Sequence, residues 1–140
     1  ELLNIIGVKD ATANLMRPTR ERNACRKGWR MVSGEDGTAL GYMAHGGHGC
    51  ISVTANVAPR LCAEFQDACL HGNYDRAREL HDKLMPLHDA MFCEPSPAPV
   101  KYAVSLLERC TPQVRLPLVE LTDAGRAKVR EAMAGVGFKV

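Results

Sequence analysis

A lysine at the end of an apolar run is the side chain of this sequence best suited to covalent chemistry. Residues 2–8 are almost all apolar, and Lys9 follows them directly. If this run is a strand of a parallel sheet, Lys9 lies at the carboxyl end of the strand, where the active sites of α/β folds gather. Partial burial among Ile5, Ile6 and Val8 would favour the neutral amine, which is the form that attacks a carbonyl carbon. The alternative is a lysine that extends into solvent or pairs with the carboxylate that follows it.

A second predicted strand, residues 29–33, ends in a turn that would share the same edge of the sheet. The turn has the sequence SGED, in which Gly34 lets the backbone approach a ligand closely and present N–H groups to a small anion. We expect Glu35 and Asp36 to be solvated turn residues rather than a pair of catalytic acid and base. Gly34 is therefore the candidate of interest in this turn.

A third predicted strand, residues 50–54, leads into the polar sequence TAN. Thr54 and Asn56 would cap the following helix, or they would line the same mouth as Lys9. We expect packed or surface side chains, rather than metal ligands or activated thiolates, at the remaining candidates, which are His45, His48, His81, His88, Cys62 and Cys69.

Composition limits the class of protein. The chain has 140 residues, of which 46% are apolar and 24% charged, as expected for one soluble globular domain. Its net charge of +2 argues against a nucleic-acid binder. It has no run of roughly 18 apolar residues that would cross a membrane, and no signal peptide, so we expect a cytoplasmic protein. Its six cysteines form no C-x-x-C pair, which favours reduced thiols.

Strands and helices alternate in the first part of the sequence. Predicted helices over residues 15–27 and 38–45 separate the three strands, which indicates successive βα units and a parallel sheet. From residue 57 onward only helices are predicted. Three parallel strands leave two open edges, so either the fold is unusual or further strands are missing from this chain. The sequence opens ELLNII without a methionine, which suggests that something preceded it.

Five stretches of the sequence together resemble one family, the dihydrodipicolinate synthases. The resemblance runs from about Asn4 to Gly137, in the family's order and spacing. The sequence GVK alone is shared by the wider superfamily of pyruvate-dependent aldolases, which includes N-acetylneuraminate lyase. The stretches are NIIGVKDATANL, SGEDGTAL, GGHGCISVTANVAPR, LMPLHDAMFCEPSPAPVKYA and VRLPLVELTDAGR.

The resemblance implies an α/β fold, namely the C-terminal half of a (β/α)8 TIM barrel. Residues 1–71 would supply the last three βα units, strands six to eight, and residues 72–140 a C-terminal helical segment. It implies a lyase that condenses pyruvate with aspartate semialdehyde, on the diaminopimelate route to lysine, through a Schiff base on Lys9. The main-chain carbonyl of Ile51 and the backbone of Gly34 would contact the pyruvate adduct. No metal or other cofactor is implied, because the imine itself is the electron sink.

The resemblance also implies what this segment lacks. The family's pyruvate-positioning threonine, its proton-relay tyrosine and its carboxylate-binding arginine belong to the first half of the barrel. The three tyrosines here, Tyr42, Tyr74 and Tyr102, do not occupy those places. Proton transfer contributes about 10²- to 10⁴-fold to such reactions, so we expect the isolated chain to be impaired.

Three hypotheses about function remain at this point. The chain is part of such a synthase, either as a fragment or as one segment of a complete enzyme whose remainder was separated. Its partner would be further copies in a homo-oligomer, commonly a tetramer in the family, or a complementary N-terminal half-barrel. Alternatively, it belongs to another pyruvate-dependent lyase of the N-acetylneuraminate lyase type. The third hypothesis is a non-catalytic half-barrel that self-associates through its open strand edges.

Overall fold

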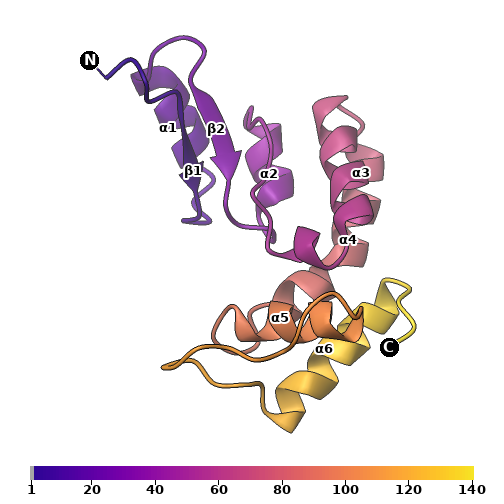
Figure 1. The fold of residues 1–140 in the computed structure, drawn as a ribbon. Helices are drawn as coiled ribbons and strands as arrows, with labels where there is room; N and C mark the ends of the chain where they lie inside the picture. Colours follow the sequence, from indigo (N-terminus) through magenta and orange to yellow (C-terminus); the bar gives the residue numbers. More distant parts are fainter. Residues whose placement is uncertain (1) are drawn as a thin grey trace.

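The computed structural model describes residues 2–140. Short βα units come first in the chain, and helices make up the remainder (Figure 1). The elements are β1 (Gly7–Asp10), α1 (Arg17–Ala24), β2 (Arg30–Ser33), α2 (Ala39–Ala44), the 3-10 turn η1 (Thr54–Asn56), α3 (Pro59–Leu70), α4 (Tyr74–Ala90), α5 (Ala98–Leu106) and α6 (Asp123–Gly135).

The sheet is parallel, as the alternation of strands and helices predicts. β1 pairs with β2 so that Lys9 lies beside Val32 and Asp10 beside Ser33. A single parallel bridge between Ser33 and Cys50 adds the start of a third strand on the far side of β2. The carboxyl ends of all three segments therefore meet at one edge, which is the arrangement that a site at strand ends needs.

The apolar core lies mainly among the helices of the second half. α3 packs along α4, and α4 packs against α6. Leu84 and Leu87 of α4 and Val129 and Met133 of α6 are each completely buried. Helix α4 thus connects the βα units to the C-terminal helices, and its packing fixes the position of everything that touches it.

Side chains cap two of the helices. Asn73 caps α4 by accepting a hydrogen bond from the Arg76 amide, and Thr122 caps α6 by accepting one from the Gly125 amide. Gly72 has a positive φ of 70°, which is why glycine suits the turn between α3 and α4. Helix α4 continues through Pro86.

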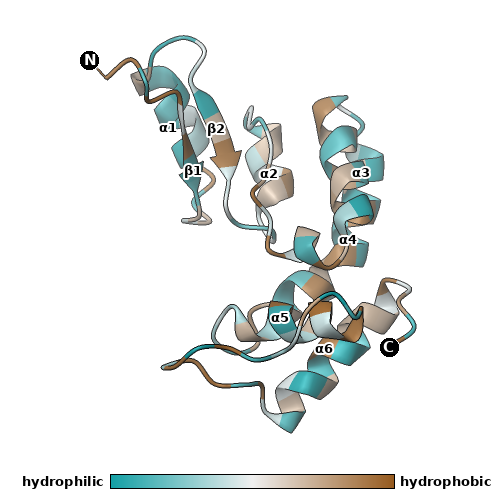
Figure 2. Cartoon of the chain, viewed as in Figure 1, coloured by the Kyte–Doolittle hydropathy of each residue, from teal (hydrophilic) through white to brown (hydrophobic). Residues whose placement is uncertain are grey.

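The prediction of a strand over residues 2–8 is wrong in its extent. β1 begins only at Gly7, and the apolar side chains before it are exposed: Leu2 by 71%, Leu3 by 72% and Ile6 by 64%. Figure 2 shows this hydrophobic stretch extending from the body of the structure near the N-terminus. Within residues 2–140 no second strand pairs with the outer edge of β1, so the run has no partner against which to bury its side chains.

The prediction of a strand over residues 50–54 is also wrong beyond its first residue. After the bridge at Cys50 the chain turns into η1, because the amides of Val53 and Thr54 donate to the carboxylate of Asp36 instead of to a neighbouring strand. The prediction that Thr54 or Asn56 caps α3 is wrong as well. Ala58 is the capping residue, and no side chain caps the helix.

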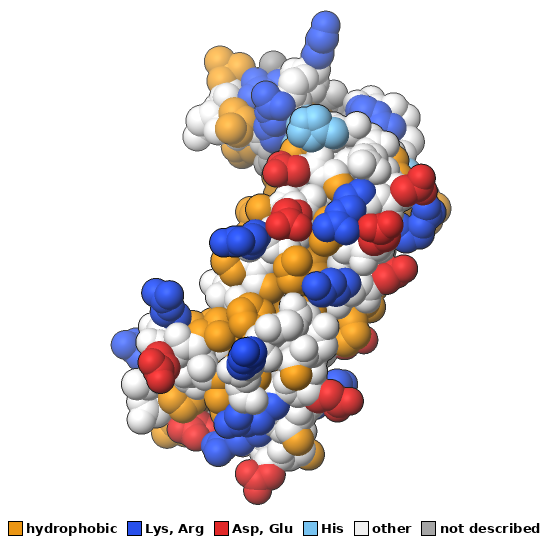
Figure 3. Space-filling view, turned by 90° about the vertical axis from the view of Figure 1, so that its right-hand side faces the viewer, with side chains coloured by type: hydrophobic (Ala, Val, Ile, Leu, Met, Phe, Trp, Pro, Cys, Tyr) orange, Lys and Arg blue, Asp and Glu red, His pale blue; other side chains and the backbone are white. Residues whose placement is uncertain are grey.

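On one face of the structure the charged side chains are spread out rather than concentrated (Figure 3). On the face shown in Figure 3, acidic and basic side chains are interspersed on both sides of a band of apolar side chains. Among the described residues, no helix combines the length and the hydrophobicity needed to cross a bilayer.

Candidate active site

The structure brings Lys9 and Gly34 together. Lys9 lies on β1, and its aliphatic stem passes directly over Gly34 at the end of β2. A methyl group on Gly34 would lie 2.7 Å from Cε and 3.1 Å from Cγ of Lys9. The Gly34 amide donates a 2.8 Å hydrogen bond to the carbonyl of Asp10, which fixes the loop beside the strand. The absence of a side chain at Gly34 is therefore what leaves room for the lysine.

Lys9 does not pair with Asp10. The Asp10 carboxylate is buried and accepts hydrogen bonds from the Thr12 amide at 2.9 Å and from Nε of Arg17 at 2.8 Å. Burial alone would raise the pKa of Asp10, but the bonds from Thr12 and the charge of Arg17 outweigh it and hold the pKa below its usual value. The negative charge next to Lys9 is thus neutralised by Arg17, and the lysine amine has no carboxylate partner within 4 Å among residues 2–140.

The predicted partial burial of Lys9 is wrong for this chain. Lys9 is exposed, as are Ile5 and Ile6, at 46% and 64%. The reason is again the open edge of β1, because a strand with one neighbour shields its side chains from one side only. Its place at the carboxyl end of the strand, over Gly34, agrees with the prediction.

Ile51 lies on the third segment of the same edge. Its amide donates a 2.8 Å hydrogen bond to the carbonyl of Ser33, the residue before Gly34. Its own carbonyl accepts no hydrogen bond from the residues that the structure describes, and its side chain is 54% exposed. An unpaired carbonyl next to the Gly34 loop is available to a ligand.

Asp36 is a buried carboxylate that the sequence did not single out. It was expected to be a solvated turn residue, but it is only 5% exposed. Its Oδ2 atom accepts hydrogen bonds from the Val53 amide at 2.9 Å and from the Thr54 amide at 3.3 Å. Val53 and Thr54 lie 17 and 18 positions after Asp36, so no local pattern in the sequence reveals this contact.

A second buried contact joins this region to α4. Oγ1 of Thr54 and Nδ1 of His88 lie 2.7 Å apart, and both residues are almost completely buried. The prediction of a packed histidine is confirmed at His88. The sequence predicts a packed or surface side chain here, but it does not identify Thr54 as the partner.

The other candidates of the sequence have structural roles. Nδ1 of His48 accepts a hydrogen bond from the Met31 amide at 3.1 Å, and Nδ1 of His45 contacts the Gly41 carbonyl at 2.7 Å. Cys62 is buried, and burial raises the pKa of its thiol to about 11. This agrees with the prediction that its environment does not stabilise a thiolate.

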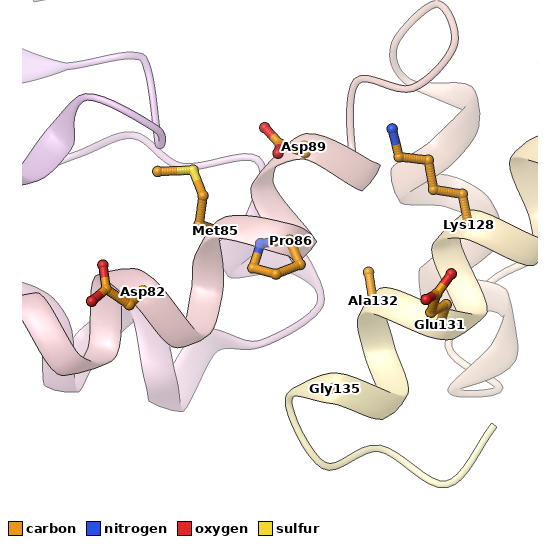
Figure 4. Close-up of a pocket in the computed structure, with 8 residues that line it drawn as sticks. All are labelled: Asp82, Met85, Pro86, Asp89, Lys128, Glu131, Ala132 and Gly135. Carbon is orange, nitrogen blue, oxygen red and sulfur yellow. The ribbon is translucent and has the colours of Figure 1, made fainter.

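A separate groove of about 700 Å³ lies between α4 and α6 (Figure 4). None of the predicted site residues lines it. Met85 belongs to its wall and also lies near Gly37 of the β2 loop, since a methyl group on Gly37 would be 3.9 Å from its sulfur. The groove is therefore a neighbour of the strand-end site and not part of it.

Replacing Gly34 with alanine is expected to lower the free energy of unfolding by about 1–3 kcal/mol. The added methyl group would lie 2.9 Å from Cβ of Ala11 as well as against the Lys9 stem, so both must move. Urea denaturation of the chain and the variant measures the change. Gly135→Ala is the control, because a methyl group there meets no atom within 4 Å and alanine favours a helix. Equal stability of Gly34→Ala and the parent would contradict this packing.

The melting temperature is expected to fall as the pH drops from about 7.5 to about 5.5. Burial lowers the pKa of His88, against the opposing influence of Asp36, while the unfolded chain keeps the ordinary histidine value of about 6.5. The unfolded state therefore takes up protons first, and stability is lost as the pH falls through about 6.5 towards the lowered value. Thermal melts of the chain and of His88→Asn measure this. The variant should depend less steeply on pH, with the remainder due in part to His81, whose pKa burial also lowers. Identical slopes would contradict a neutral His88.

The comparisons with known proteins agree on one family. A sequence model of the Dihydrodipicolinate synthetase family matches residues 1–135. The 4-hydroxy-tetrahydrodipicolinate synthase of Afipia carboxidovorans is 60% identical over 138 residues, which are 99% of this chain and 47% of the relative. The synthase of Rhizobium meliloti is 57% identical over 135 residues, which are 96% of this chain and 46% of that protein.

Solved structures give the same result for the fold. The chain superposes on dihydrodipicolinate synthase from Aquifex aeolicus with a TM-score of 0.91 and 37% identity, over 94% of this chain and 45% of the other. The chain thus spans about half the length of the relatives it matches. The predicted fold, the C-terminal half of a TIM barrel followed by helices, is confirmed.

Proposed function

We propose, since the chain belongs to the dihydrodipicolinate synthetase family, that it is the lysine-bearing half of an enzyme that condenses pyruvate with aspartate semialdehyde. The product of that condensation, 4-hydroxy-tetrahydrodipicolinate, lies on the diaminopimelate route to lysine. The observation that carries the proposal is the position of Lys9, which lies over Gly34 where the carboxyl ends of the strands meet. The similarity to the synthases of Afipia carboxidovorans and Rhizobium meliloti supports the choice of reaction.

In the proposed mechanism Lys9 acts by covalent catalysis. Its neutral amine attacks the keto carbon of pyruvate, and loss of water gives a protonated imine. The imine draws electrons from the neighbouring methyl group, which loses a proton and becomes an enamine carbon nucleophile. The enamine attacks the aldehyde carbon of aspartate semialdehyde, and cyclisation with release of the product frees Lys9. The reaction needs no metal and no other cofactor, because the imine serves as the electron sink.

Two backbone groups are proposed to bind the pyruvate adduct. The carbonyl of Ile51 would accept a hydrogen bond from it, and the open backbone at Gly34 would admit it beside Lys9. Both groups lie at the same edge as the lysine, and the Ile51 carbonyl has no other partner in the described part of the chain. Side-chain chemistry at these positions plays no part in the proposal.

The partner that we propose for this chain is a complementary N-terminal half-barrel. The surface that such a half would cover consists of the outer edge of β1 and the exposed apolar side chains of Leu2, Leu3, Ile5 and Ile6. Burial there would partly desolvate Lys9. We further propose a homo-oligomer in the cytoplasm. Residues 1–71 would form the barrel part and residues 72–140 the helical segment, with the turn at Gly72 between them.

The experiment that tests the function supplies the missing half. The chain is co-expressed with the first half of the Afipia carboxidovorans synthase, and turnover of pyruvate is measured with aspartate semialdehyde and with N-acetylmannosamine. Turnover with aspartate semialdehyde but not with N-acetylmannosamine supports the proposal. Preference for the sugar aldehyde would favour an N-acetylneuraminate lyase. An assembled barrel without activity towards either would favour the hypothesis of a non-catalytic half-barrel.

A further inference from the structure

We propose that the buried carboxylate of Asp36 is a positioning residue, which fixes the Ile51 carbonyl relative to Lys9. This inference deepens the proposed function and rests on it, because the direction of the Ile51 carbonyl matters only if a pyruvate adduct forms on Lys9. Asp36 itself touches neither the amine nor the substrate. It acts through the backbone amides of the segment that follows Ile51.

Asp36 joins two segments of the site. It lies two residues after Gly34, in the loop that ends β2. Its carboxylate accepts the amides of Val53 and Thr54, two and three residues after Ile51. One side chain therefore ties the loop beneath Lys9 to the segment that carries the carbonyl.

Hydrogen bonds hold the backbone on both sides of the Ile51 carbonyl. On its N-terminal side, the Ile51 amide donates a 2.8 Å hydrogen bond to the Ser33 carbonyl. On its C-terminal side, the amides of Val53 and Thr54 donate to Asp36 and fix the next two peptide groups. The peptide plane in between has little freedom to turn, so its carbonyl keeps one direction although nothing in the described chain bonds to it.

The segment that Asp36 holds is also fixed to α4. Thr54 is completely buried, and its hydroxyl meets His88 of α4 at 2.7 Å. The loop after β2, the segment after Ile51 and α4 thus form one buried polar network. Hydrogen-bonded groups behind a reactive edge of this kind limit the movement of the groups in front of them.

The burial of a charge here calls for a functional reason. Within residues 2–140, no lysine, arginine or histidine nitrogen lies within 4 Å of the Asp36 carboxylate, so backbone amides are its main partners. Desolvating a carboxylate costs folding free energy. Because η1 is only one turn long, the stability gained by holding that turn is small in comparison. Precise placement of a carbonyl at the site accounts for the burial better.

Asp36→Asn is the first test, made in the barrel assembled from this chain and the first half of the Afipia carboxidovorans synthase. Asparagine keeps the shape of the side chain but loses the charge that holds the two amides. The KM for pyruvate is expected to rise by about tenfold, with the KM for aspartate semialdehyde changed by less than about twofold. Hydrogen exchange at the amides of Val53 and Thr54 should become faster.

Val53→Pro is the second test and keeps the carboxylate. The φ of Val53 is −75°, which proline adopts readily, and proline removes one of the two amides that Asp36 accepts. It should raise the KM for pyruvate in the same way. Val129→Ala, a core change in α6 remote from the strand ends, is the control for lost stability, and Asp82→Asn is the control for a lost exposed carboxylate. Both controls should leave the KM for pyruvate unchanged.

The outcomes separate this inference from the function on which it rests. If the parent barrel forms no imine on Lys9, the proposed function fails, and the role of Asp36 fails with it. If the parent is active and exchange becomes faster at residues 53 and 54 in Asp36→Asn, or at residue 54 in Val53→Pro, without a change in KM, Asp36 is only structural and the inference is overturned. A rise in KM that matches that of Val129→Ala at equal loss of stability overturns it as well.

Discussion

Replacing Lys9 with arginine is expected to lower the turnover rate of the assembled barrel on the order of a thousandfold or more. Arginine keeps the positive charge and the long stem, but its guanidinium does not form an imine with pyruvate. In the isolated chain, where Lys9 is exposed and has no ion pair among the described residues, the melting temperature should hardly change. Steady-state kinetics and thermal melts of both proteins measure the two effects.

The matched control for this change is Lys83→Arg. Lys83 is an exposed lysine of α4, far along the chain from the strand ends. It should keep full activity. Turnover of Lys9→Arg within tenfold of the parent would contradict the role of Lys9 as nucleophile, since no other change to the site accompanies the substitution.

The isolated chain is expected to turn over at least about 10²- to 10⁴-fold more slowly than the assembled barrel. In the proposed enzyme the proton-transfer groups lie in the complementary half-barrel, so Lys9 alone would have no relay. The open edge of β1 and the exposed residues Leu2, Leu3 and Ile6 should also make the isolated chain self-associate. Turnover assays and sedimentation velocity, with and without the first half of the Afipia carboxidovorans synthase, measure both effects.

The control for this comparison is the first half of the relative on its own. It carries no equivalent of Lys9 and should be inactive, so activity on mixing requires contact between the halves. A chain that sediments as a stable monomer and turns over as fast alone as in the mixture would contradict the proposal that the site is completed by another half-barrel.

The sequence predicted the parallel βα units, the helical second half and the meeting of Lys9 with Gly34. These depend on local signals, namely apolar runs and the glycine-containing turn that ends the second strand. The extent of the first strand was predicted wrongly because an apolar run indicates that a segment would be buried by neighbours on both sides, whereas among the described residues β1 has a neighbouring strand on one side only. The apolar pattern also could not show that Lys9 is exposed here.

The buried polar network was missed for a different reason. Asp36 follows a glycine in an acidic turn, which is typical of solvated residues, and its amide partners lie 17 and 18 positions later in the chain. The contact of Thr54 with His88 spans 34 positions. Contacts between distant segments form only when the fold brings them together, so residue spacing within one segment carries no signal for them.

The most direct test of the central claim is to trap the imine. The assembled barrel is incubated with pyruvate, reduced with borohydride, digested and mapped by mass spectrometry. We expect one reduced pyruvate adduct per chain, located on Lys9 and absent from Lys9→Arg. An active barrel that carries its adduct on another lysine, or carries none, would contradict the role of Lys9 as the imine-forming residue.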